Sequence, residues 1–342
     1  MLQVKYILDN KDKVIEGLKK RNLDSDSLIQ EIIELNIKRK DRISKVEILR
    51  AEGNKMSKEI GGLFKEGKNE EANEAKSKVQ AIKGEQKSLE DGMHEIENKF
   101  TDLLYRIPNV PHETVPTGKL EEDNVEIFRE GEIPNLHEGA KPHWDIVKEK
   151  DIIDFETGVK IAGAGFPVYK GKGARLQRAL INFFLDEADK SGYHEVIPPL
   201  LINEASGIGT GQLPDKEGQM YHAVADDLYL IPTAEVPVTN IYRDVILSED
   251  ELPKKHTAYT PCFRREAGSY GKDVRGLNRL HQFDKVEIVQ VVHPDNSYAV
   301  LDEMVDHVKG LVRKLGLPFR ILRLCGGDLG FTAALTYDFE VF

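Results

Sequence analysis

Cysteine, tryptophan and long apolar runs are scarce in this 342-residue sequence, which contains two cysteines and one tryptophan. Cys262 and Cys325 lie far apart and have no partner at metal-ligand spacing, which argues against a disulfide framework and against a thiolate zinc site. No stretch approaches the roughly 20 apolar residues that a membrane span needs, and the N-terminus is too acidic and too weakly apolar for a signal peptide. We therefore expect a cytoplasmic protein.

The chain also lacks an excess of positive charge. It has 48 lysines and arginines against 59 acidic residues, which gives a net charge of −11. Proteins that neutralise nucleic-acid phosphates are usually basic overall, so this total alone counts against a nucleic-acid partner. The local distribution of charge has to decide the question.

Residues 28–103 contain no proline, and Phe64 and Phe100 are their only Phe, Tyr or Trp residues. Apolar positions recur there in two series with alternating spacings of three and four residues, which predicts two long helices packed as a coiled coil. The first series is Leu28, Ile32, Leu35, Arg39, Arg42, Val46, Leu49, Gly53, Met56, Ile60 and Leu63. The second series is Ala72, Ala75, Val79, Ile82, Gln86, Leu89, Met93, Ile96, Phe100 and Leu103.

Turn-forming residues separate the two series. Gly61, Gly62, Gly67 and Asn69 predict a reversal of direction, and hence an antiparallel helical hairpin. At a rise of about 1.5 Å per residue each helix would extend on the order of 50 Å, too far to fold back inside a compact domain. We expect the hairpin to project into solvent, where a coiled coil used for oligomerisation is the general alternative.

Prolines become frequent after Leu103, and we place a domain boundary near Ile107. The predicted domains are residues 1–107 and 108–342. In the second domain, short β-branched runs alternate with helical stretches, which predicts a mixed domain and an α+β fold overall.

The segment from Pro261 to Val289 reads as two strands joined by a loop rich in Gly, Ser, Lys and Arg. Side chains alternate along a strand, so Arg264 and Glu266 share one face of the first strand. The second strand carries four polar or charged side chains and one phenylalanine on one face: Arg279, His281, Phe283, Lys285 and Glu287. Arginine suits phosphate, an aromatic face suits a nucleobase and a carboxylate suits an amine, so this surface suits ATP. A solvated hairpin with cross-strand ion pairs is the alternative.

These residues resemble motif 2 of the class II aminoacyl-tRNA synthetases, and the whole chain resembles the seryl-tRNA synthetase family. Residues 173–201 are similar to motif 1, LYLIPTAEVPVTN to the family's serine-binding loop, and GGDLGFTAALTYDFEVF to the region that leads towards motif 3. The resemblance implies a coiled-coil hairpin joined to an antiparallel sheet flanked by helices. It also implies a serine–tRNA ligase, which activates L-serine with ATP to seryl-adenylate and transfers the seryl group to tRNA(Ser).

The resemblance also implies roles for individual residues. Arg264 would be the catalytic residue at the α-phosphate of ATP. Glu266 would contact the adenine amine, and Phe283 would stack on adenine. The remaining ATP-binding residues would be Arg265 and Leu280. The serine site would comprise Thr233, Ala234 and Glu235, with Glu287 on the substrate ammonium. For Thr233 to Glu235 a simple helix start, with threonine as N-cap, is the alternative.

In the family the hairpin grips the long variable arm of tRNA(Ser), with tRNA(Sec) as an additional candidate partner. The first helix carries a basic cluster that can neutralise phosphates despite the acidic total. The cluster is Lys38, Arg39, Lys40, Arg42 and Lys45. Motif 1 implies a homodimer through Ala174–Leu201.

The sequence stops at Phe342, before the family's metal ligands and motif 3. We expect a C-terminally truncated chain that lacks ligands for the expected Mg²⁺ and shows no serine-dependent ATP–pyrophosphate exchange. The alternative is a non-catalytic homologue that binds tRNA or forms dimers without motif 3. A relative that aminoacylates carrier proteins is disfavoured, because such relatives lack the long hairpin.

Overall fold

The structure is a computed structural model that describes residues 2–215, 218–266 and 275–342. The chain divides into two compact units. The first unit comprises Met1–Ile127 and Leu322–Asp338, and the second comprises Phe128–Ile321 and Phe339–Phe342. The boundary expected near Ile107 therefore lies inside the first unit, because the segments that follow it and that end near Asp338 pack with the N-terminal part.

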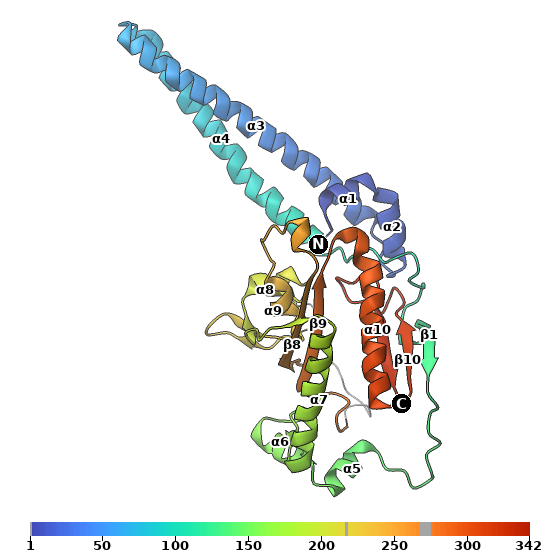
Figure 1. Cartoon of the computed structure of the whole chain (residues 1–342). Helices are drawn as coiled ribbons and strands as arrows, with labels where there is room; N and C mark the ends of the chain where they lie inside the picture. The colour runs from blue at the N-terminus through green and yellow to red at the C-terminus, as the bar shows by residue number, and fades with distance from the viewer. Residues whose placement is uncertain (1, 216–217, 267–274) are drawn as a thin grey trace. The chain divides into compact units, whose positions relative to one another are not determined.

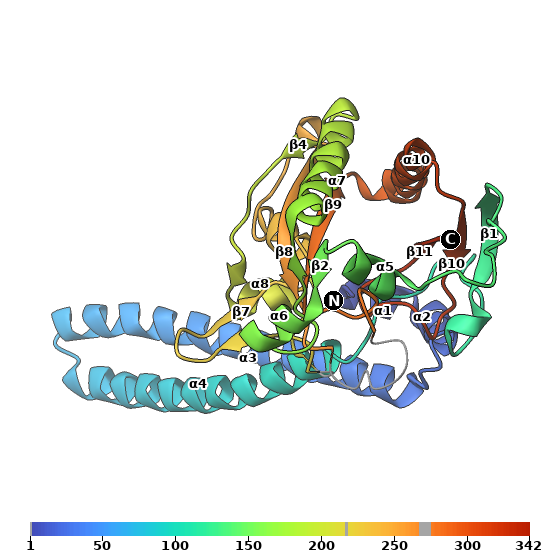
Figure 2. The ribbon, with the colours of Figure 1, turned by 90° about the horizontal axis from the view of Figure 1, so that it is seen from below.

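The first unit is dominated by a helical hairpin, which we call the arm. It consists of α3 (Asp26–Lys65) and α4 (Asn69–Leu104), and two views at right angles agree that the helices run side by side (Figures 1 and 2). Every position of the two predicted apolar series is buried or half-buried. The predicted coiled-coil hairpin is thereby confirmed.

The turn of the arm is shorter than the glycines suggest. Gly61 and Gly62 lie inside α3, and the chain reverses only after Lys65. Gly67 has a φ of +76°, a left-handed conformation that glycine adopts without steric cost. The prediction that Gly61 and Gly62 belong to the turn was wrong, because glycine within a helix costs only about 1 kcal/mol and the helix can continue through it.

The base of the arm is closed by two short helices, α1 (Val4–Asp9) and α2 (Lys11–Lys19). Their apolar side chains pack with both arm helices in one core. Its buried members are Ile7, Val14, Ile15, Leu18, Ile29, Ile32, Leu35, Phe100, Leu103, Leu104 and Ile107.

Arg21, directly after α2, ties distant segments of the first unit together. Its guanidinium donates to the carbonyl oxygens of Asn109 at 2.8 Å and Leu329 at 3.1 Å, and also to those of Gly330 and Ala333. Desolvation by burial lowers the pKa of Arg21 to about 10. The buried charge is thus balanced by backbone carbonyls of two segments that are far apart in the sequence.

The second unit is built around a three-stranded sheet in the order β4–β8–β9. Strand β8 (Lys254–Phe263) pairs antiparallel with β9 (Gln282–Val291), and the short β4 (His194–Glu195) runs parallel to β8. Helix α7 (Gly171–Lys190) lies along one face, where Gln177 Nε2 donates to Asp284 Oδ2 at 2.9 Å (Figure 2). The predicted sheet flanked by helices is confirmed.

Helix α9 (Glu235–Asn240) covers the opposite face of this sheet. Ala234 and Val238 pack there against Ala258 of β8 and Val289 of β9. Residues of one strand that share a face are two positions apart, so Phe283, Lys285 and Glu287 lie on the same side as Val289. The polar residues of β9 therefore lie on the face of the sheet that α9 covers.

The remaining elements of the second unit surround this sheet. A second small sheet has the order β5–β7–β6, formed by β5 (Leu201–Ile202), β7 (Leu228–Leu230) and β6 (His222–Ala223), with α8 (Glu204–Gly209) beside it. The other helical elements are α5 (His143–Glu149), α6 (Phe155–Ile161), η2 (Glu249–Glu251), η4 (Pro294–Asn296) and α10 (Ser297–Leu315). The chain passes between the two units within β1 (Val125–Glu130), β10 (Phe319–Arg323) and β11 (Tyr337–Val341), paired in the order β1–β10–β11. The first unit also contains η1 (Glu121–Asp123).

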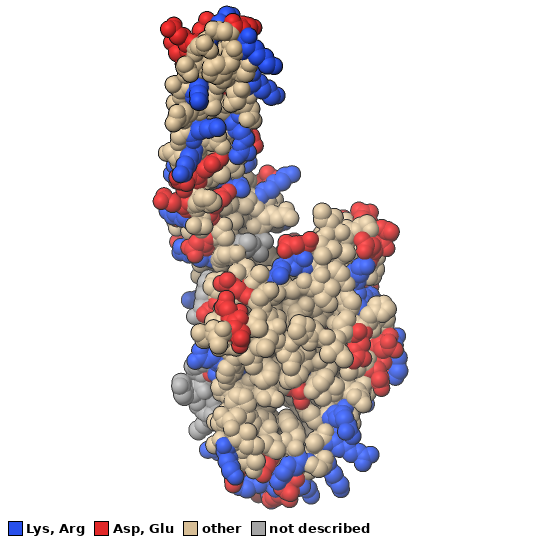
Figure 3. Space-filling model, turned by 90° about the vertical axis from the view of Figure 1, so that its left-hand side faces the viewer, with Lys and Arg blue, Asp and Glu red and all other residues tan. Residues whose placement is uncertain are grey.

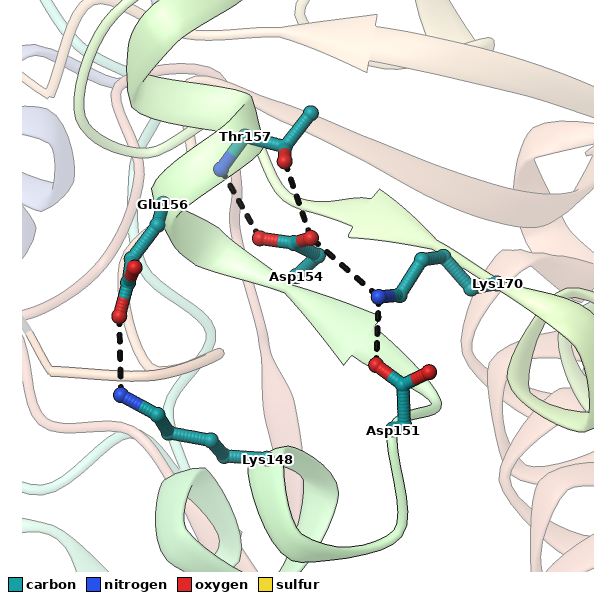
Figure 4. A network of polar contacts seen from close by, with 6 residues as sticks. All are labelled: Lys148, Asp151, Asp154, Glu156, Thr157 and Lys170. Atoms are coloured by element: carbon teal, nitrogen blue, oxygen red, sulfur yellow. Dashed lines mark hydrogen bonds and ion pairs between the residues drawn. The ribbon is translucent and has the colours of Figure 1, made fainter.

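A polar network fixes the segment that leads into α7. Asp154, at the end of β2 (Ile153–Asp154), caps α6 by accepting from the amide nitrogen and the hydroxyl of Thr157, both at 2.9 Å. Lys170 follows β3 (Val168–Tyr169) and pairs with both Asp151 and Asp154 (Figure 4). One lysine thus joins β2, β3 and the start of α7.

Candidate functional site

The floor of the candidate site is the buried side of the β8–β9 pair. The register places Phe283, Lys285 and Glu287 opposite Cys262, Thr260 and Ala258, respectively. The three β8 residues are at most 1% exposed, so they form a closed surface beneath the longer β9 side chains. Burial raises the pKa of the Cys262 thiol, which keeps it protonated and unreactive.

Thr233, just before α9, contacts two charged residues of β9. Its hydroxyl donates to Glu287 Oε2 at 2.8 Å and accepts from Lys285 Nζ at 3.0 Å. Lys285 Nζ also lies 2.6 Å from Glu287 Oε2. The same hydroxyl accepts from the amide nitrogen of Glu235 at 3.2 Å. Thr233 therefore lies just before α9 and contacts both its first residue and two charged residues of β9, but the expected threonine N-cap was wrong because the N-cap residue is Ala234.

Glu235 brings a second carboxylate to this group. Desolvation by the surrounding residues, followed by the negative charge of Glu287, raises the pKa of Glu235 although the residue is exposed at the surface, while Lys285 and Arg264 act in the opposite direction. A cation beside these carboxylates is favourable, and Lys285 Nζ already lies 2.6 Å from Glu287 Oε2. The site is therefore suited to a positively charged ligand such as an ammonium group.

Arg264 follows the last residue of β8 and remains beside β9. Its Nε donates to the carbonyl oxygen of Pro232 at 3.3 Å, and its guanidinium carbon lies 5.0 Å from the centre of the Phe283 ring. Its amide nitrogen donates to the carbonyl oxygen of His281 at 3.0 Å. The structure thus brings the predicted phosphate ligand, the predicted adenine-stacking ring and the predicted serine loop into one site.

The predicted strands end sooner than expected on both sides of the connecting loop. Strand β8 ends at Phe263 and β9 begins at Gln282, so Arg264, Glu266, Arg279 and His281 lie outside the strands. Glu266 has a φ of +48°, which is incompatible with a continuing strand. Assigning those four residues to the strands was wrong, because the pairing stops at Phe263 and Gln282. Part of the predicted loop, residues 267–274, lies outside the described residues.

The other predicted ATP residues occupy this loop region. Glu266 pairs with Arg279 at 3.0 Å, and its side chain is 15% exposed. Arg265 is exposed and donates its amide nitrogen to the carbonyl oxygen of Gln219 at 2.9 Å. Leu280 is half-buried, two residues before β9. Ala234, expected in the serine site, is fully buried against the sheet, so it supports the site from behind.

Sequence reasoning missed a group that supports Arg264 from the side of the loop. His281 Nδ1 shares a hydrogen bond of 2.7 Å with the hydroxyl of Tyr221, and its ring stacks on Phe166 with centroids 5.4 Å apart. His281 was visible in the face pattern of the hairpin, but Tyr221 and Phe166 come from distant segments and carry no local signal. Lys285 was also placed on the correct face and yet was not assigned to the site.

The basic residues of the arm divide into two kinds. Lys38, Lys40 and Lys45 are exposed, whereas Arg39 and Arg42 are half-buried in the seam. Arg39 Nε lies 3.4 Å from Glu97 Oε1 of the other helix. Arg42 lies over Gly92, where a Cβ atom would be 2.2 Å from its Nη1. Figure 3 shows basic and acidic side chains interspersed along one face of the arm, so the positive charge is local.

Residues 2–215, 218–266 and 275–342 contain no group of three or more His, Cys, Asp or Glu side chains that could hold a metal ion. Within the same ranges, no helix is long and apolar enough to cross a membrane.

Comparison with known proteins first identifies the class. Residues 221–342 match the family model of the tRNA synthetase class II core domain (G, H, P, S and T). The matched residues include the β8–β9 pair, and the class is that of the class II aminoacyl-tRNA synthetases.

The comparisons then identify the family. Residues 1–111 match the seryl-tRNA synthetase N-terminal domain. The whole chain is 45% identical to the serine–tRNA ligase of Salinibacter ruber and 48% identical to that of a Hydrogenobaculum strain, and it covers 80% of each. It matches a crystal structure of seryl-tRNA synthetase from Pyrococcus horikoshii complexed with ATP with a TM-score of 0.90 and 33% identity, over all of this chain and 80% of that one. The chain belongs to the seryl-tRNA synthetase family, a family of aminoacyl-tRNA ligases.

Proposed function

We propose that the α9-covered face of β9 binds serine and ATP for the serine–tRNA ligase reaction, the activity of the family to which the chain belongs. In the first step a serine carboxylate oxygen attacks the α-phosphorus of ATP in line and pyrophosphate leaves. In the second step the terminal hydroxyl of tRNA(Ser) attacks the seryl carbonyl carbon and AMP leaves. The contact of Thr233 with Glu287, beside Glu235, is the observation that carries this proposal.

Glu287 and Glu235 would hold the substrate ammonium. Glu287 has a 19% exposed side chain and already accepts two hydrogen bonds from cationic or hydroxyl donors, so its carboxylate is oriented before the substrate arrives. Thr233 fixes that orientation because its hydroxyl is held at the start of α9. An ammonium group would also relieve the repulsion between the two carboxylates.

Arg264 and Phe283 would hold ATP. The guanidinium would contact the α-phosphate and remain there when pyrophosphate leaves, and the ring would stack on adenine. Glu266, Arg265 and Leu280 are the remaining proposed ATP residues. Mg²⁺ would enter with ATP as part of the substrate.

The arm would bind tRNA(Ser), and tRNA(Sec) is an additional candidate. An α-helix turns by about 100° per residue, so Lys38, Arg42 and Lys45 lie within one stripe, while Lys40 lies about 200° from Lys38, on the other side of the helix. Lys45 pairs with Asp41 at 2.8 Å, so part of its charge is compensated. We propose that the stripe of Lys38 and Lys45 faces the tRNA backbone.

We also propose a homodimer formed through Ala174–Leu201. This segment exposes several large apolar side chains, among them Leu176 at 57%, Ile197 at 90% and Leu201 at 44%. Burial of such side chains in a partner would contribute roughly 25 cal/mol per Å² of apolar surface. Ile197→Asp should shift the sedimentation coefficient from that of a dimer to that of a monomer, whereas Ile246→Asp, at another exposed isoleucine, should not. A dimer that persists in Ile197→Asp would contradict this assignment.

Serine binding tests the proposed function directly. Calorimetric titration should give serine binding to the wild-type chain, and Glu287→Gln should weaken it by about 10–100-fold, the equivalent of about 1.5–3 kcal/mol for a hydrogen bond to a charged group. Glu251→Gln is a matched control. Glu251 precedes β8 and pairs with Lys254, the first residue of that strand, away from Thr233. Equal serine affinity in the wild type and in Glu287→Gln would refute the serine site.

A further inference from the structure

Lys285 is a charged side chain of this site to which the reaction above gives no task. It lies on β9 between Phe283 and Glu287, and residues two positions apart on a strand are separated by about 6.6 Å. Its neighbours in the proposed function are therefore the adenine-stacking ring on one side and the anchor of the substrate ammonium on the other. The serine carboxylate and the α-phosphate must meet between those two points.

The contacts of Lys285 are those expected of the substrate itself. Its Nζ lies 2.6 Å from Glu287 Oε2 and 3.0 Å from Thr233 Oγ1. The first oxygen atom belongs to a residue that the proposed function assigns to the ammonium group of serine, and the second belongs to the residue that orients it. In this structure the lysine ammonium thus occupies the position of the substrate ammonium.

We propose that serine and Lys285 exchange places at Glu287. The substrate ammonium displaces Lys285 Nζ from Glu287, and the released lysine turns towards the serine carboxylate and the α-phosphate, where its positive charge stabilises the negative charge of the adenylation transition state. This inference rests on the proposed function. Lys285 keeps its proton throughout and forms no covalent bond.

The charges of the site support such an exchange. Glu235 and Glu287 carry two negative charges, Lys285 carries one positive charge, and Arg264 is assigned to the phosphate. An arriving ammonium replaces the positive charge that Lys285 supplied to the carboxylates, so their net charge balance is unchanged and Lys285 is free to act elsewhere. The reacting carboxylate and phosphate are both anionic, so a second cation beside Arg264 reduces their repulsion as the new bond forms.

A permanent clamp is the competing explanation, in which Lys285 only holds Glu287 and Thr233 in position. The two explanations predict different effects on serine affinity when Lys285 is removed. An exchanging lysine competes with serine for Glu287, so its removal leaves serine affinity unchanged or higher and slows adenylation. A clamp supports the serine site, so its removal weakens serine binding and leaves the chemical step intact.

The experiment uses an enzyme extended through the family's motif 3, in which we expect exchange to be recovered, and its Lys285→Met variant; this extended enzyme is the wild type of the comparison. We expect serine titrated without ATP to bind the variant at least as tightly as the wild type, while the kcat of serine-dependent ATP–pyrophosphate exchange falls by about 10²–10³-fold. Lys285→Arg should recover part of the rate because it retains the charge. Lys254→Met is the matched control. Lys254 is the first residue of β8 and pairs with Glu251, whereas Lys285 lies opposite Thr260 near the other end of β8.

Tenfold weaker serine binding with an unchanged kcat would overturn the exchange in favour of the clamp. Lys285→Gln provides the same comparison should Lys285→Met fold poorly, as judged by circular dichroism. A wild-type enzyme that neither binds serine nor catalyses exchange would refute the proposed function itself. A wild type that does both, with a Lys285→Met variant equal to it, would refute only the role of Lys285.

Discussion

The division of the arm's basic residues into exposed lysines and seam arginines predicts which of them bind tRNA. We expect Lys38→Ala combined with Lys45→Ala to weaken tRNA(Ser) binding. Both residues are exposed and lie seven positions apart on one stripe of α3. Lys40→Ala is the matched control, because this lysine is equally exposed but points to the other side of the helix.

The magnitude follows from counterion release. Each lost phosphate contact should reduce the slope of log K against log salt by about 0.9 on a duplex target, so the double variant should reduce it by up to about 1.8. Raising the salt from 50 to 200 mM should therefore weaken tRNA binding by the double variant roughly twelvefold less than it weakens binding by the wild type. Compensation of Lys45 by Asp41 makes this an upper limit.

Fluorescence anisotropy with labelled tRNA(Ser) at a series of salt concentrations measures the slope. Arg39→Ala combined with Arg42→Ala should change it little, because these side chains contact Glu97 and Gly92 of the opposite helix. The reasoning fails if the double lysine variant leaves the slope unchanged while the arginine pair reduces it by about 1.8 or Lys40→Ala reduces it by about 0.9.

Three further predictions concern stability. The pKa of Glu187 is lowered from 4.5 to about 2, first by Lys190 and then by Lys314, so its stabilisation is present above pH 4.5 and is lost as the pH falls towards 2. Glu187→Gln should flatten the acid limb of a pH series of urea unfolding, and equal limbs would contradict this. Asp154→Ala should lower the free energy of unfolding by about 1 kcal/mol through loss of the α6 cap, and Asp154→Asn should retain most of it in the same urea titration. Gly92→Ala should raise the thermal midpoint of the arm, followed by helical circular dichroism, because a gain of up to about 1 kcal/mol in helix propensity exceeds the cost of moving the flexible tip of Arg42; a lower midpoint would refute it.

Periodicity predicted the long helices of the arm and one face of β9, where a repeating sequence pattern coincides with an uninterrupted helix or strand. The two apolar series of the arm mark buried or half-buried positions throughout α3 and α4, even at Arg39, Arg42 and Gly53. Seven-residue spacing depends only on the geometry of a helix, so a few polar members do not hide it. Alternation likewise placed Phe283, Lys285 and Glu287 on one face of β9.

Element ends and long-range contacts were beyond such patterns. Glu266 ends the pairing through a left-handed backbone angle, which sequence spacing does not reveal. The contact between Thr233 and Glu287 joins residues far apart in the chain, and the resemblance to a family suggested it where no local pattern could. Lys285 has no special spacing, and only the measured distances give it a place in the site.

The carbonyl contacts of Arg21 have a consequence for the order in which the protein is made. Arg21 is synthesised early, but its acceptors at Leu329, Gly330 and Ala333 follow only after the long segment of the second unit has been synthesised. Until then its guanidinium has to stay hydrated, because a charged group that is buried without partners costs several kcal/mol. The ribosome thus releases the arm and the helices at its base long before Arg21 gains these acceptors. A nascent chain stopped before Leu329 should present a formed helical hairpin with a hydrated Arg21, which makes the first unit the first to begin folding and one of the last parts to finish.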